Sequence, residues 1–270
     1  MRTLKRLRFC VLLSCAILIT LSAFLGPALA PEDPNRIDLN RIYQPPDRNN
    51  LFGTDAVGRD LFSRVIHGAR NSFALTLTMV LIVACIGSII GMASGYIGGA
   101  ADSVIMQITD VLLSFPTVVF AITIAVIWGA GIYRTLTALA LVSWAKYARM
   151  ARGLILDIRS SEYITQARFA GARRRHILFK YLLPNILPQI IVITTSDIGE
   201  MMVTLSALSF LGVTGSPYEP EWGRMLADSR SNFLIHPYSM IYPGLALLIV
   251  VIVFYLLGDS LRDVLDPKEK

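Results

Sequence analysis

Residues 73–96, FALTLTMVLIVACIGSIIGMASGY, are 24 consecutive residues without a charged side chain. About 20 apolar residues in a helix cross the roughly 30 Å hydrocarbon core of a bilayer, with every backbone polar group paired inside the segment. The stretch therefore predicts a membrane-spanning helix. It sets the fold class of the whole chain, because five further stretches share its length and apolar character.

The composition agrees with a chain built for a membrane. The 270 residues are 54% hydrophobic and 16% charged, with a mean hydropathy of +0.58. This balance speaks against a disordered chain, a soluble enzyme and, despite the net charge of +6, a nucleic-acid-binding protein. We predict an all-α polytopic membrane protein with six transmembrane helices, at about 9–30, 73–96, 104–129, 132–150, 186–211 and 239–258.

The positive charges predict the topology. Basic residues cluster at the N-terminus, in or beside the loop between the fourth and fifth predicted spans, and in the tail. They are Arg2, Lys5, Arg6 and Arg8, then Lys146, Arg149, Arg152, Arg159, Arg168, Arg173, Arg174, Arg175 and Lys180, then Arg262, Lys268 and Lys270. Segments rich in Lys and Arg face the cytoplasm, so we expect both termini there.

Three regions follow from these spans. Residues 1–30 form an N-terminal tail and the first transmembrane helix, retained as an anchor because its apolar run is longer than that of a signal peptide. Residues 31–71 form an external segment with a short amphipathic helix at 57–66, on which Arg59, Asp60 and Arg64 make the polar face. Residues 72–270 form a five-helix core.

The second span carries Gly87, Gly91, Gly95 and Gly99 at intervals of four. On a helix this spacing makes a shallow groove that lets another helix approach closely. Packing within the chain and a moving gate interface both use such a groove.

The basic segment between the fourth and fifth spans predicts a helix at about 160–175. Ser160 or Ser161 would cap it, and Glu162 would lie near the positive end of its dipole. Ile164, Ala167, Ala170 and Gly171 then share one narrow face of mostly small side chains, suited to insertion into a groove on a partner. A solvated helix without a partner is the alternative.

Asp197 and Glu200 lie one turn apart within the fifth span, followed by Met201 and Met202. Carboxylates inside a membrane usually face a cavity or a partner, so these four residues are candidates for a translocation path. Asp197 is also a candidate metal ligand. A buried hydrogen bond or ion pair explains the carboxylates equally well, and Asp110 in the third span invites the same two interpretations.

Catalytic constellations are missing from the sequence. It has no H-E-x-x-H, G-x-S-x-G or phosphate-binding G-x-x-x-x-G-K-[ST] motif, and its three histidines fall in three separate regions. We expect a protein that is not an enzyme and binds no cofactor itself.

From about residue 45 onward the chain resembles the permease subunits of binding-protein-dependent ABC importers, in the dipeptide, oligopeptide and nickel branch. The motifs that carry the resemblance are LFGTDAVGRDLFSR at 51–64, Ser143-Trp144 with ARMAR at 148–152, EYITQARFAG at 162–171 with LPN at 183–185, LSFLG at 208–212, EWGRM at 221–225 and GDSLRDVLDP at 258–267.

The resemblance implies that 160–175 is a cytoplasmic coupling helix docked on an ATP-hydrolysing subunit, with Glu162, Tyr163, Ala167, Arg168 and Gly171 as its coupling residues. The family motif has Glu-Ala-Ala six, five and four residues before the glycine. This chain has Thr165, Gln166 and Ala167 there, so only the last alanine and the glycine match.

The implied assembly contains a second homologous permease subunit, two cytoplasmic ATPase subunits that hold ATP and Mg²⁺, and an external solute-binding protein. It lies in the inner or plasma membrane of a prokaryote and involves the lipid bilayer but no nucleic acid.

Within this branch, the fifth span is more similar to nickel permeases, which carry a comparable Asp-Ile-Gly-x-Met-Met run, than to peptide permeases. Glu200 departs from the histidine expected there. The favoured cargo is nickel, as an ion or a small chelate, and the alternative is a dipeptide or oligopeptide. An ion-coupled secondary transporter with Asp110, Asp197 and Glu200 as a relay is a further hypothesis.

Overall fold

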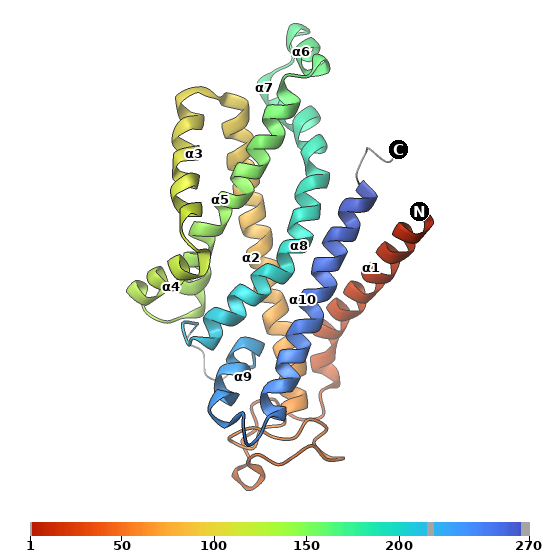
Figure 1. The fold of residues 1–270 in the computed structure, drawn as a ribbon, viewed down its shortest axis with the longest axis vertical. Coiled ribbons are helices and arrows are strands. Elements are labelled where there is room, and N and C mark those ends of the chain that lie inside the picture. Colours follow the sequence, from red (N-terminus) through yellow and green to blue (C-terminus); the bar gives the residue numbers. More distant parts are fainter. Residues whose placement is uncertain (1, 215–218, 266–270) are drawn as a thin grey trace.

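The computed structural model describes residues 2–214 and 219–265 (Figure 1). Within them the chain is helical, with no strand and one isolated bridge between Thr54 and Asp60, which confirms the all-α class. The elements are α1 (Arg2–Leu25), η1 (Gly26–Leu29), η2 (Leu39–Arg41), α2 (Leu61–Ile97), α3 (Gly99–Ser114), α4 (Thr117–Trp128), α5 (Ile132–Arg159), α6 (Glu162–Phe169), α7 (Arg174–His176), the π-helical η3 (Ile177–Leu182), α8 (Leu183–Phe210), α9 (Trp222–Ser229), η4 (Arg230–Asn232) and α10 (Tyr238–Leu265).

Four helical segments in the described part of the chain are long and apolar enough to span a bilayer. They are Lys5–Leu29, Leu61–Ile97, Ile177–Phe210 and Tyr238–Leu265. The number rises to five if the bent pair α3 and α4 counts as one span. α5 contains the predicted fourth span but carries basic residues in both halves, so it does not pass the same test. Six spans therefore stay a prediction.

The predicted third span, 104–129, is not one continuous helix. α3 and α4 meet at an angle of 91°. Phe115 has an extended backbone (φ −103°, ψ 144°) directly before Pro116. The proline ring disfavours helical backbone in the residue before it and lacks an N–H donor, so α3 ends at Ser114 and α4 starts in a new direction.

The glycines of the second span lie against α5, the helix with which α2 packs most extensively. A Cβ added at Gly87 would lie 2.6 Å from Cβ of Tyr147, and one at Gly91 would lie 2.8 Å from Cα of Ala148. At Gly95 the nearest α5 atoms would be 3.1 Å away, and at Gly99 nothing lies within 4 Å. The first three glycines therefore form the predicted helix-packing groove.

The two ends of the molecule carry different elements of the chain (Figure 1). The start of α1 and the end of α10 lie toward the end that carries α6, whereas residues 31–60 and α9 lie toward the opposite end. This arrangement agrees with termini on the same side as the basic segment, although the cytoplasmic side itself stays a prediction. Lys268 and Lys270 of the predicted basic tail lie outside the described residues.

Residues 57–66 do not form a separate short helix. The long helix α2 begins at Leu61, where the Asp60 carboxylate accepts a hydrogen bond from the Ser63 N–H at 2.8 Å and caps the helix. The amphipathic pattern of this stretch is therefore the pattern of the first turns of α2, which pack against the rest of the chain.

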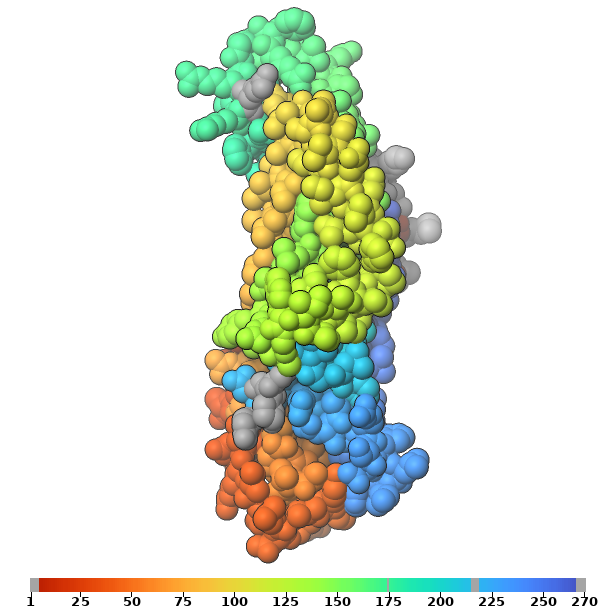
Figure 2. Space-filling view, turned by 90° about the vertical axis from the view of Figure 1, so that its left-hand side faces the viewer, coloured from red at the N-terminus to blue at the C-terminus, as the bar shows by residue number. Residues whose placement is uncertain are grey.

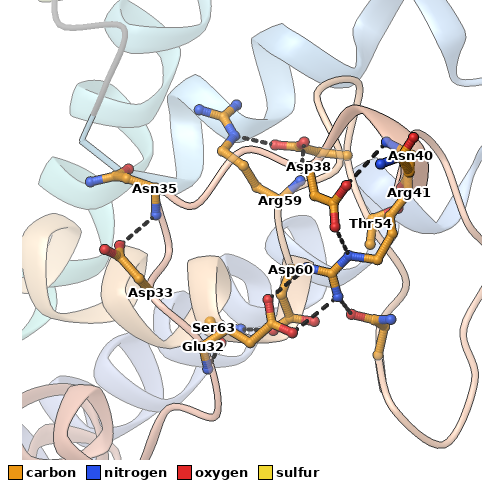
Figure 3. A network of polar contacts seen from close by, with 12 residues as sticks. Glu32, Asp33, Asn35, Asp38, Asn40, Arg41, Thr54, Arg59, Asp60 and Ser63 are labelled. Atoms are coloured by element: carbon orange, nitrogen blue, oxygen red, sulfur yellow. Dashed lines mark hydrogen bonds and ion pairs between the residues drawn. The ribbon is translucent and has the colours of Figure 1, made fainter.

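Residues 31–60 form a network of buried and half-buried charges among themselves and with the start of α2 (Figure 3). Arg64, predicted on the polar face, has a side chain only 1% exposed, 3.6 Å from Asp55, and it donates to the Pro34 carbonyl at 3.0 Å. Arg41 donates to both oxygens of Glu32, at 3.0 and 2.9 Å. This hydrogen-bonded pair holds the pKa of the Glu32 carboxyl below its usual value.

Candidate functional site

The predicted coupling helix is shorter than expected. α6 covers Glu162–Phe169, eight residues rather than the whole of 160–175, and Gly171 follows in the left-handed region (φ 79°) that commonly ends a helix. Glu162 lies in the first turn as predicted. The expected serine cap is wrong, because Ser161 Oγ donates to the Ile158 carbonyl at 2.7 Å and makes no cap hydrogen bond.

The prediction for the docking face of α6 is wrong for Ile164. Ile164 is fully buried in a small hydrophobic cluster with Ile155 of α5 and with Ile177, Leu182 and Ile186 of η3 and α8. Ala167 is half-buried, while Ala170 and Gly171 are exposed. The face with Ile164 therefore fixes α6 to its own chain, and the opposite side is the one presented outward.

The outward side of α6 carries aromatic and charged side chains. Phe169 is 88% exposed and Tyr163 is 43% exposed, while Glu162 is exposed beside them. Arg168 lies over the Tyr96 ring, 5.4 Å from its centroid. The segment that bears α6 projects at one end of the molecule (Figure 2). The sequence analysis missed Phe169, although its position five residues after Ile164 placed it on the opposite side of the helix.

The structure brings Asp197 and Glu200 together through a third residue that the sequence analysis assigned to a loop. Lys146 Nζ of α5 donates to Asp197 Oδ1 at 2.8 Å and to Glu200 Oε2 at 2.9 Å. The side chains are 44% exposed for Lys146, 12% for Asp197 and 70% for Glu200. We call Lys146, Asp197 and Glu200 the charged triad.

A pocket of about 80 Å³ surrounds the charged triad, between α3, α4, α5 and α8. Its other lining residues are mostly apolar or hydroxyl-bearing: Leu113, Thr117, Leu139, Val142, Ser143, Tyr147, Met201 and Thr204. Met202 is fully buried in the hydrophobic core instead, so it is not a lining residue. Tyr147 is buried in the wall of this pocket.

Beyond Lys146, the basic residues assigned to the loop continue along α5 and pair with neighbouring helices. Arg149 pairs with Asp110 of α3. Arg152 holds both oxygens of Asp102 of α3 at 2.6 Å. Asp110 is thus engaged with Arg149, and within residues 2–214 and 219–265 no interaction joins it to the carboxylates of the charged triad.

The geometry gives little support to a metal site at Asp197. Among the described residues, no group of three or more His, Cys, Asp or Glu side chains is placed to hold an ion. The two carboxylates of the triad already share one ammonium group. A metal ion bound to both carboxylates would have to displace Lys146.

The comparisons with known proteins decide the family. Residues 87–270 match the family described as "Binding-protein-dependent transport system inner membrane component". The chain belongs to this family. It is 40% identical over 255 residues to the glutathione transport system permease protein GsiD of Pectobacterium atrosepticum, covering 94% of this chain and 85% of that relative.

Two relatives from Escherichia coli K12 are similarly close. The chain is 40% identical over 252 residues to the probable D,D-dipeptide transport system permease protein DdpC, covering 93% of this chain and 85% of the relative. It is 37% identical over 250 residues to the nickel transport system permease protein NikC, covering 93% and 90%.

These matches confirm the resemblance drawn from the sequence. The chain is an inner-membrane permease subunit of an ABC importer, and its relatives are permease subunits rather than enzymes. The names of the relatives cover glutathione, dipeptide and nickel transport, so family membership leaves the cargo undecided.

Proposed function

We propose that this permease subunit pairs with a second, homologous permease subunit and forms with it a path into the cell. A solute-binding protein delivers cargo on the side of residues 31–60, and at the opposite end one of two ATPase subunits docks on α6 while the other docks on the second permease subunit. ATP and Mg²⁺ are held by those ATPase subunits. The projecting α6, with Phe169 and Tyr163 exposed, supports this arrangement.

The proposed path passes the pocket of the charged triad. Charges within membrane-spanning helices are unfavourable toward lipid, and they normally face a water-filled cavity or another protein surface. Lys146 and Glu200 are exposed on this chain, beside a pocket that also contains hydroxyl groups. The face formed by α3, α5 and α8 is therefore the face that we assign to the path and to the second permease subunit.

The cargo that the geometry supports best is a short peptide or a peptide-like solute. The observation that supports this proposal is the position of Lys146, whose ammonium group already neutralises one of the two carboxylate charges. A divalent nickel ion at this site would lie beside the like charge of Lys146, and hard carboxylate oxygens suit nickel less well than imidazole nitrogen does. A peptide carries groups of both signs, which suits a site of mixed charge.

Uptake into proteoliposomes tests this proposal. The full complex, with its own ATPase subunits and binding protein, is reconstituted and offered alanyl-alanine, glutathione or nickel ion. We expect ATP-dependent uptake of a peptide, and we expect it to be lost when Gly171→Leu distorts the end of α6. Nickel uptake without peptide uptake would refute the peptide assignment. Uptake driven by an imposed proton or sodium gradient without ATP would refute the importer mechanism.

A further inference from the structure

The charged triad makes a site with a definite ligand chemistry. We infer that the Lys146, Asp197 and Glu200 side chains bind the ammonium and the carboxylate of a short zwitterionic cargo, and that Lys146 occupies the place of the cargo's ammonium group until the cargo arrives. The inference rests on the proposed function, because it assumes a path through this pocket.

Burial indicates which contact of the triad opens. The Asp197 side chain is 12% exposed and holds Lys146 from the protein side. The Glu200 side chain is 70% exposed and holds Lys146 from the open side. A solute entering the pocket therefore meets the Lys146–Glu200 contact first, and Lys146 keeps Asp197 as its partner when that contact separates.

The charges then remain paired in the occupied site. An ammonium group of the cargo replaces Lys146 at Glu200, and a carboxylate of the cargo accepts hydrogen bonds from Lys146. Since an ammonium carries three donors, Lys146 can serve Asp197 and the cargo carboxylate at once. Removing one partner of a charge pair out of bulk water leaves the other uncompensated, which is unfavourable. A zwitterion avoids this cost, because it brings an opposite charge to Glu200 and another to Lys146 and leaves the net charge of the site unchanged.

The rest of the pocket supports an organic ligand. The Tyr147 side chain is buried in the wall of the pocket. Leu139 and Val142 on the same wall offer apolar contact.

The test compares cargo variants across protein variants. ATP-dependent uptake of alanyl-alanine is measured against its N-acetyl form, which lacks the ammonium, and its C-terminal amide, which lacks the carboxylate. If glutathione is the faster cargo, its N-acetyl and amide forms replace them. Each protein variant gives two rate ratios, free peptide over N-acetyl and free peptide over amide. The binding protein's own preference is common to all variants and cancels when ratios are compared.

We expect E200Q to reduce the N-acetyl ratio about tenfold relative to the unchanged protein, and K146M to reduce the amide ratio by a similar factor, since hydrogen bonds to charged groups contribute at this level. Lys146→Arg should keep both ratios. Asp259→Asn is the matched control, because it removes an exposed carboxylate with its own ion pair, to Arg8, outside the pocket.

Peptide uptake with both ratios within twofold of the unchanged protein in E200Q and K146M would overturn the inference and leave the proposed function standing. Absence of ATP-dependent peptide uptake in the unchanged complex would instead overturn the proposed function. If K146M fails to assemble, E200Q decides, because Glu200 is the most exposed member of the triad.

Discussion

The contact between α2 and α5 gives the sharpest stability prediction, at Gly91. Carbon atoms in van der Waals contact lie about 3.5–4.0 Å apart. A Cβ at position 91 would lie 2.8 Å from Cα of Ala148, and all three of its nearest atoms belong to the Ala148 backbone. No side-chain rotation relieves this clash, so α2 and α5 must separate by about 1 Å at this point.

We therefore expect Gly91→Ala to destabilise the chain by about 3 kcal/mol, the upper end of the usual cost of overpacking. Such a loss corresponds to a decrease in melting temperature of about 6–12 °C. Gly153→Ala on α5 is the matched control, because it is a helical glycine with nothing within 4 Å of the added Cβ. Because alanine has a higher helix propensity than glycine, Gly153→Ala should leave the stability of the chain unchanged or raise it by up to about 1 kcal/mol.

Melting of the purified complex, followed by the loss of its monodisperse peak in size-exclusion chromatography, measures both variants. Gly95→Ala should fall between them, because the nearest atoms there are 3.1 Å away. A Gly91→Ala complex that melts within 2 °C of the unchanged one would refute the reasoning, since it would mean that the helices are not in backbone contact.

Three further predictions concern the two ends of the molecule. Arg64→Ala should leave Asp55 with less compensation in a buried site and make residues 31–60 several-fold more sensitive to limited proteolysis, whereas equal cleavage rates would contradict this role. The hydrogen bond from Arg41 lowers the pKa of Glu32, so the stabilisation from this pair should be complete above the ordinary glutamate pKa of about 4.3 and should be lost as pH falls through the lowered value. Hydrogen exchange of residues 31–60, measured at decreasing pH, should show this loss. The Glu32→Gln variant should abolish the pH dependence. Phe169→Asp should reduce ATPase stimulation by the binding protein at least fivefold without lowering the melting temperature of the permease, and unchanged stimulation would exclude Phe169 from the docking surface.

The class of the protein was predictable from the sequence because long apolar runs have few alternatives. The 24-residue stretch at 73–96 has to span a bilayer or be buried, and it forms about the last two-thirds of the 37-residue helix α2. The glycines at intervals of four predicted close helix packing, because this spacing places them on one face of the helix. The break at Phe115-Pro116 was also present in the sequence as an X-Pro signal, but the apolar run around it was interpreted as one span.

The site was harder to predict, because helical spacing tells which residues share a face but not what that face meets. Ile164 and Ala167 were correctly placed on one side of a helix, yet that side packs against the chain's own α5 and α8. Lys146 was counted with the basic loop because it begins a run of positive charges. Only the folded structure shows that Lys146 donates hydrogen bonds to Asp197 and Glu200.

The small cluster around Ile164 has a mechanical consequence. It joins α6 to the end of α5 and the start of α8, and these two helices carry opposite sides of the charged triad. Asp197 lies eleven residues beyond Ile186 of the cluster, or about 16 Å along the axis of α8. A tilt of α8 against α5 by about 5° around the cluster displaces the Asp197 carboxylate by about 1.4 Å at that distance. A displacement of that size away from Lys146 stretches a contact of 2.8 Å beyond hydrogen-bond range, so a small rotation imposed at α6 is sufficient to change the charge pairing deep in the pocket.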